Sequence, residues 1–88
     1  MKSYKILLRD FLSEYVDALR KRKELSQENM AEQLRITSRA YSDLERGKYC
    51  FSTVPLLFLL LMLDDDELRN LLAQFRESVA VLENQHAA

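Results

Sequence analysis

Apolar residues recur every three or four positions over most of this chain, a spacing that places them on one face of a helix. Within residues 4–23 the recurring apolar residues are Leu8, Phe11, Leu12, Tyr15, Val16 and Leu19. Within residues 64–84 they are Leu68, Leu71, Leu72, Phe75, Val79 and Leu82. No segment alternates apolar and polar residues for long enough to indicate a strand. The pattern predicts an all-α fold with extended first and last helices.

Three shorter helices are expected between the two long ones, because a capping residue precedes each new segment. The caps of the second to fifth helices are Ser26, Thr37, Ser52 and Asp64, and Glu67 completes a capping box with Asp64. The second and third helices together occupy about residues 26–46 and are separated by a turn at residues 35–37. Gly47, the only glycine, suits the left-handed conformation that ends a helix. Residues 1–88 therefore predict a single five-helix domain.

Composition narrows the class of protein. The 88 residues are 48% hydrophobic, which is typical of an ordered small domain. The apolar run at residues 54–63 is shorter than the roughly 20 residues that span a membrane, so we expect a soluble, cytoplasmic protein with no membrane partner. The only cysteine, Cys50, is isolated, the only histidine, His86, is terminal, and no glycine-rich phosphate loop is present. We therefore expect no enzyme activity, metal, cofactor or small-molecule substrate.

Charge is divided unevenly along the chain. Residues 1–50 carry eleven Lys/Arg against eight Asp/Glu, a net charge of +3, whereas residues 51–88 carry a net charge of −4. The overall net charge of −1 argues weakly against a nucleic-acid partner. The local potential at a contact surface matters more for phosphate binding than the sum over the molecule. The basic residues in and around residues 20–48 therefore keep DNA among the expected partners.

Two helices joined by a three-residue turn cross steeply, so the second of them can protrude. If Tyr41 and Leu44 face the core, the outward side chains of that helix are Ser38, Arg39, Ser42, Asp43 and Arg46. Arg39 could then contact guanine through two hydrogen bonds, and Asp43 could accept a hydrogen bond from cytosine. An ordinary solvated helix face would carry similar residues, so both interpretations are open on residue types alone.

The segment "LSQENMAEQLRITSRAYSDLERGK", residues 25–48, resembles the helix-turn-helix of the phage-repressor family of Cro-type or XRE-type regulators. The residues in register with that family are Leu25, Ser26, Gln27, Glu28, Ala31, Leu34, Ser42, Leu44, Glu45 and Gly47. The resemblance covers about residues 19–63. It implies a lambda-repressor-like domain that binds double-stranded DNA and regulates transcription.

The resemblance also implies roles for individual residues. It places base reading at Ser38, Arg39, Ser42 and Asp43. Gln27 sits where the family contacts a backbone phosphate and braces the recognition helix, and Arg46 and Lys48 are further candidate phosphate contacts. Arg20 and Glu45 sit where the family has a structural ion pair.

Three departures from the family pattern stand out. Asp43 on the expected reading face repels phosphates, so it would weaken DNA binding without the right base. Arg35 occupies a turn position that is usually glycine, so it is expected either to adopt a left-handed conformation at some energetic cost or to contact a phosphate. Phe58 and Leu61 occupy positions that are often polar, and a helix that is apolar all round must be covered. The cover could be the fifth helix or a second copy of the chain. The apolar stripe of the fifth helix could also simply close the core of the monomer. We favour the second copy, a homodimer that packs through Phe58, Leu61, Leu68, Leu72, Phe75 and Val79.

The sequence thus predicts a dimeric repressor that reads a two-fold operator through its third helix. An alternative is a protein-interaction module on the same fold, such as an antitoxin or the partner of an anti-repressor. Its contact surface would be the apolar and acidic C-terminal helices.

Overall fold

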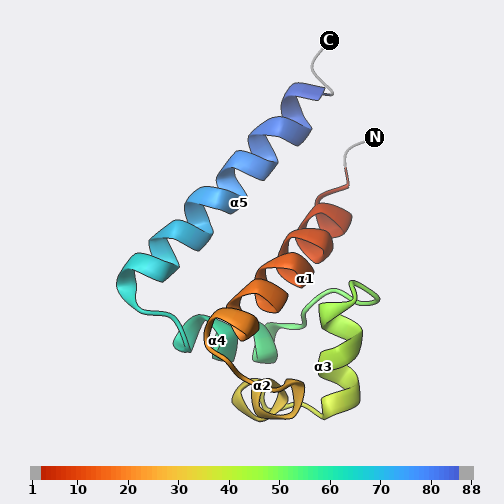
Figure 1. The fold of residues 1–88 in the computed structure, drawn as a ribbon. Helices are drawn as coiled ribbons and strands as arrows, with labels where there is room; N and C mark the ends of the chain where they lie inside the picture. The colour runs from red at the N-terminus through yellow and green to blue at the C-terminus, as the bar shows by residue number, and fades with distance from the viewer. Residues whose placement is uncertain (1–2, 86–88) are drawn as a thin grey trace.

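The structure, a computed structural model, describes residues 3–85, and every regular element in that range is a helix (Figure 1). The helices are α1 (Tyr4–Arg22), α2 (Gln27–Leu34), α3 (Ser38–Glu45), α4 (Thr53–Leu61) and α5 (Asp65–Gln85). This confirms an all-α fold of five helices whose first and last members are the longest. The terminal His86 lies outside the described residues.

Most of the predicted helix starts are fixed by the expected caps. The Ser26 side chain accepts a hydrogen bond from the Asn29 amide at 3.0 Å, and the Thr37 side chain accepts one from the Ala40 amide at 3.1 Å. The box at the start of α5 is formed in both directions, since Glu67 N donates to Asp64 Oδ1 at 2.8 Å and Asp64 N donates to Glu67 Oε1 at 3.1 Å. Ser52 stands at the N-cap of α4 but makes no side-chain capping bond.

Three residues adopt left-handed backbone conformations where helices end. Gly47 has φ 73° after α3, as its position predicts. Arg35 has φ 61° after α2, which confirms the strained conformation expected of an arginine in a glycine position. Glu24, with φ 56°, was not anticipated.

The buried core lies among α1, α2, α3 and α4. Its fully buried side chains are Leu12, Val16, Leu19, Met30, Leu34, Tyr41 and Leu59. Helix α3 contacts both α1 and α2, and α2 contacts α4. Helix α3 is therefore packed against two neighbouring helices.

Helix α5 packs antiparallel along α1 (Figure 1). The Phe11 and Phe75 rings are 5.2 Å apart between centroids, and the Tyr4 hydroxyl donates to Glu83 Oε2 at 2.7 Å. Of the two covers that the sequence allows for α4, the fifth helix does not serve as one, because the apolar stripe of α5 packs along α1. Helix α4 keeps Val54, Leu57 and Leu61 exposed, and Leu61 is 77% exposed.

Candidate nucleic-acid interface

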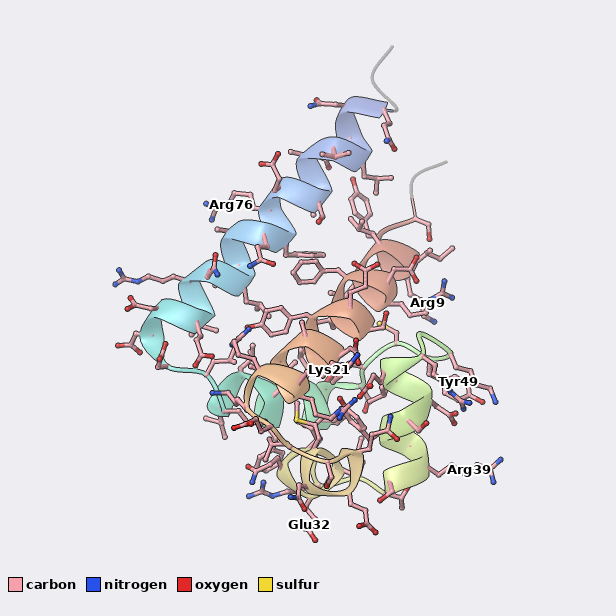
Figure 2. All side chains as sticks on the ribbon, viewed as in Figure 1. Arg9, Lys21, Glu32, Arg39, Tyr49 and Arg76 are labelled. Atoms are coloured by element: carbon pink, nitrogen blue, oxygen red, sulfur yellow. The ribbon has the colours of Figure 1, made fainter. Side chains whose placement is uncertain are left out.

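The N-terminal half of α3 presents polar side chains to solvent. Ser38 and Arg39 are exposed, whereas Ser42 is only partly exposed. Within residues 3–85 the Arg39 guanidinium makes no hydrogen bond or ion pair, and the side chain points away from the body of the molecule (Figure 2). Arg39 is thus a cationic fork with all of its donors available, held at the edge of the domain by a packed helix.

Asp43 does not face outward as the sequence analysis expected. The residue is only 9% exposed, and its carboxylate accepts a hydrogen bond from Arg46 Nη2 at 2.6 Å. Lys48 N also donates to the Asp43 carbonyl at 2.9 Å, a backbone bond that closes the C-terminal end of α3. The inward positions of Tyr41 and Leu44 predict an outward Asp43, but helix periodicity does not reveal the burial of Asp43 or its pairing with Arg46.

An ion pair connects the end of α3 to α1. Arg20 Nη2 and Nε donate to the two carboxylate oxygens of Glu45, each at 2.9 Å. A further Arg20 donor reaches the Leu25 carbonyl at 3.1 Å, so the same side chain also holds the segment that leads into α2. The pairing of Arg20 with Glu45 agrees with the resemblance, and two parallel hydrogen bonds fix both distance and orientation.

The electrostatics of the pair follow from these contacts. Burial is the largest single effect on the Glu45 carboxyl and raises its pKa. The hydrogen bonds from Arg20, the neighbouring Tyr41 and Asp17 side chains and the positive charge of Arg20 together outweigh burial, so the pKa falls from 4.5 to about 2. Burial raises the pKa of the neighbouring Tyr41 hydroxyl, and the Glu45 charge adds to the rise. At neutral pH the site therefore contains a charged pair beside a neutral phenol.

Gln27 lies at the exposed start of α2, beside this pair. Its Nε2 is 3.5 Å from Glu45 Oε1, the limit of a hydrogen bond. The side chain thus connects the first turn of α2 to the last turn of α3. This is the bracing position that the resemblance implies.

The other predicted phosphate contacts differ in whether their side chains are already engaged with neighbouring groups. Lys48 is exposed, with its ammonium 5.5 Å from the centroid of the Tyr49 ring. Arg46 is exposed but bonded to Asp43. The Arg35 guanidinium lies over the Phe58 ring at 4.2 Å and donates to the Gln33 carbonyl at 2.6 Å. Arg35 is therefore already engaged with α2 and α4.

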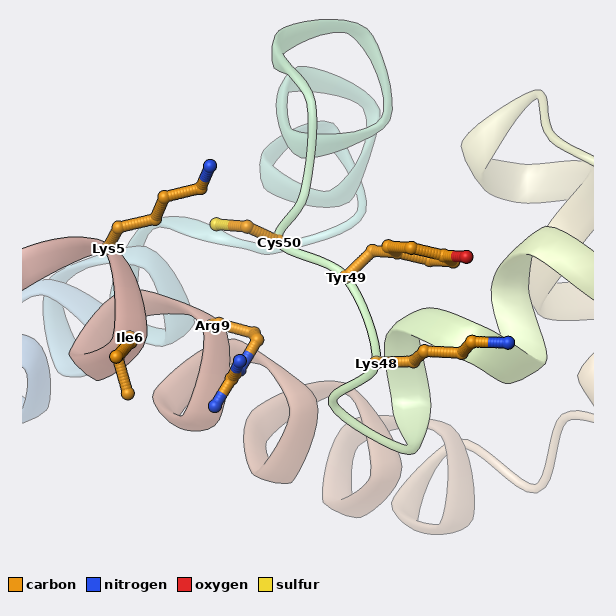
Figure 3. A pocket seen from close by; sticks show the side chains of 6 residues that line it. All are labelled: Lys5, Ile6, Arg9, Lys48, Tyr49 and Cys50. Carbon is orange, nitrogen blue, oxygen red and sulfur yellow. The ribbon is translucent and has the colours of Figure 1, made fainter.

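Sequence reasoning missed one basic region of the surface. Lys5, Ile6 and Arg9 of α1 meet Lys48, Tyr49 and Cys50 around a hollow of about 260 Å³ (Figure 3). The usable signal was the spacing of Lys5 and Arg9, which are four residues apart and therefore share one face of a helix. Nothing in the sequence alone shows that this face meets the loop after α3.

The fold and the exposed second helix of its motif define the class of protein. Residues 16–59, half of the chain, match the family model described as helix-turn-helix. The chain belongs to the Cro/C1-type helix-turn-helix family, a non-enzymatic DNA-binding family. The match supports a DNA-binding regulator in general and double-stranded DNA as its partner. No curated protein and no solved structure matches the chain. Among residues 3–85, no helix combines the length and apolar character needed to cross a membrane.

Proposed function

We propose that this protein is a sequence-specific repressor that inserts the N-terminal half of α3 into the major groove. The observation that carries the proposal is Arg39, an exposed arginine without a partner in the described chain, on a helix fixed from behind by Arg20 and Glu45. An arginine in this position can donate two hydrogen bonds to guanine. Ser38 and Ser42 flank it as further base contacts. Asp43 instead positions Arg46.

The proposed phosphate contacts surround the base-reading residues Ser38, Arg39 and Ser42. Gln27 lies at the start of α2, where backbone amides and the helix dipole favour an anion. Arg46 and Lys48 follow α3, and both side chains are exposed. Such contacts set the register of the protein on DNA without selecting a sequence. Arg35 is the weakest member of the predicted set, because Phe58 and the Gln33 carbonyl already engage it.

We further propose that the protein acts as a homodimer on a two-fold operator, with α4 at the interface. Val54, Leu57, Phe58 and Leu61 line an open hollow of about 250 Å³ made of apolar side chains alone. A patch of this kind on a small domain is a common mark of a protein–protein contact. Two copies would supply two recognition helices for half-sites one DNA turn apart. Of the predicted α5 residues, Leu72 is exposed, whereas Leu68, Phe75 and Val79 are partly buried.

The DNA proposal is tested by selecting from a randomised duplex library at two salt concentrations, with wild type and Arg39→Ala side by side. Wild type should enrich a two-fold motif. Arg39→Ala should lose about 1–3 kcal/mol of discrimination at one base position in each half-site. The matched control is Arg76→Ala, which removes the same charge from an exposed position on α5 (Figure 2). Absence of any enrichment at low salt would refute the proposal.

The dimer is tested by sedimentation with Leu61→Ser and Leu72→Ser, which alter exposed leucines on α4 and α5. The α4 interface predicts that Leu61→Ser weakens self-association and that Leu72→Ser does not. The reverse result would assign the interface to α5. A wild-type protein that stays monomeric with and without operator DNA would refute the dimer.

A protein-interaction module is the second candidate function, favoured by the same α4 patch together with the net charge of −4 over residues 51–88. A monomer that enriches no DNA sequence would favour this function over the repressor. In that case α4 is the surface on which to search for a partner.

A further inference from the structure

The hollow beside the start of α1 joins two parts of the chain that are far apart in sequence. Lys5 and Arg9 lie before residue 16, where the family match begins, and Lys48 and Tyr49 lie inside the matched segment. The structure places all four side chains around one hollow (Figure 3). The basic surface after α3 therefore continues onto α1.

The cationic groups around this hollow are spread apart and do not converge. In Figure 3 the Lys48 side chain extends toward α3, while Lys5 and Arg9 point in other directions from α1. Lys5 and Arg9 are separated by one helical turn, a rise of about 6 Å. A small anion needs donors that converge on one point, whereas separated cations suit an extended polyanion with regularly spaced charges.

Asp10 is the acidic group that pairs with these cations among the described residues, and it leaves most of their donors available. Arg9 Nε donates to Asp10 Oδ1 at 3.1 Å, and both side chains are partly or fully exposed. The terminal nitrogens of Arg9 take no part in that bond. No hydrogen bond or ion pair engages Lys5 or Lys48 within the described part of the chain. Tyr49 and Ile6 are exposed beside them.

The surface formed by Lys5, Arg9 and Lys48 lies on the same side of the molecule as α3. In Figure 2 Arg9, Tyr49 and Arg39 follow one another along the side that carries α3, whereas Arg76 lies on the opposite side. A duplex engaged by Arg39 would therefore extend toward the start of α1.

We propose that Lys5 and Arg9, together with Lys48, contact backbone phosphates of the DNA that flanks the bases read by α3. This inference rests on the proposed function and adds a contact surface outside the matched helix-turn-helix segment. The contacts are electrostatic and carry no sequence information. They offset the unfavourable net charge of the whole chain by concentrating positive charge along one side.

The test compares wild type with Lys5→Ala/Arg9→Ala for binding to the selected operator between 50 and 200 mM salt. The probes are a duplex with flanking DNA and one trimmed to the half-sites. Each phosphate contact contributes about 0.9 to the slope of log affinity against log salt, so losing two contacts should lower the slope by about 1.8 on the long duplex. The advantage of wild type should then shrink about tenfold over that salt range. On the trimmed duplex the two proteins should differ much less.

The matched control is Arg69→Ala/Arg76→Ala, which makes the same change in net charge on exposed positions of α5. The control should keep the wild-type slope. Thermal unfolding by circular dichroism checks that each variant is folded. If the salt slope of Lys5→Ala/Arg9→Ala equals that of the control and Arg39→Ala still loses base discrimination, this inference is overturned and the proposed function stands. A wild-type protein that binds no DNA would instead overturn the proposed function, and this inference with it.

Discussion

The ion pair between Arg20 and Glu45 gives the sharpest test of how α3 is fixed to α1. The Glu45 side chain is only 9% exposed and that of Arg20 is 16% exposed, so replacing one partner leaves the other charge largely desolvated. Breaking a fully buried pair costs about 3–5 kcal/mol, and exposed pairs contribute about 0.2–1 kcal/mol. For this partly solvated pair we expect Glu45→Leu and Arg20→Met each to lower the free energy of unfolding by about 2–3 kcal/mol.

The double variant Arg20→Met/Glu45→Leu should cost much less than the sum of the two single variants. No unpaired charge remains in it, and apolar side chains of similar size can replace a buried ion pair with little loss. The assay is urea unfolding followed by circular dichroism, with coupling taken from the double-mutant cycle. Lys21→Met is the control, since Lys21 pairs with Asp17 but is largely exposed, and its change should stay within about 0.5 kcal/mol. Additive losses from the two single variants would refute the view that the pair acts as one buried unit.

Two further predictions concern stability. Because the pKa of Glu45 is about 2 in the folded chain against 4.5 ordinarily, its contribution is present above pH 4.5 and is lost as pH falls toward 2. Urea unfolding from pH 6 to pH 2 should show wild type losing stability relative to Arg20→Met/Glu45→Leu as the pH falls below 4.5. A difference in unfolding free energy that stays constant over this range would contradict the prediction. At Arg35, glycine should be more stable than alanine by about 1 kcal/mol, because φ is 61° and both replacements lose the contact with Phe58. The control is Ala73→Gly in helix α5, where glycine should instead lower the free energy of unfolding by about 0.5–1 kcal/mol. Equal stability of the Arg35→Ala and Arg35→Gly variants would contradict the proposed strain at residue 35.

Much of the fold could be predicted because its signals are local. A capping serine or threonine acts on an amide three residues away, as Ser26 and Thr37 do, and the box of Asp64 and Glu67 lies within one turn. The left-handed conformation of Arg35 was readable from its position in the motif. The ion pair of Arg20 and Glu45 was available only through the resemblance, because 25 residues separate the two.

The features that could not be predicted from the sequence depend on which helix faces and loops contact one another in the folded domain. The stripe of α5 predicts an apolar neighbour but does not say which one, and the neighbour is α1. Helix periodicity predicts an exposed Asp43, but in the folded domain the residue is buried. The basic surface of Lys5 and Arg9 becomes visible only when the start of α1 is set beside Lys48. Each of these facts is a matter of tertiary contact, which periodicity cannot supply.

The antiparallel seam between α1 and α5 also sets an order of events in folding. Its outermost contact joins Tyr4 to Glu83, 79 residues apart in the chain. Almost the whole core lies between residues 12 and 59, and α5 adds only Leu71 to the buried residues. Contacts so distant in sequence carry the largest loop-closure entropy, so we expect the seam to close after residues 12–59 have packed. We also expect the seam to open first, so that the amides of α5 exchange with solvent earlier than those of α3.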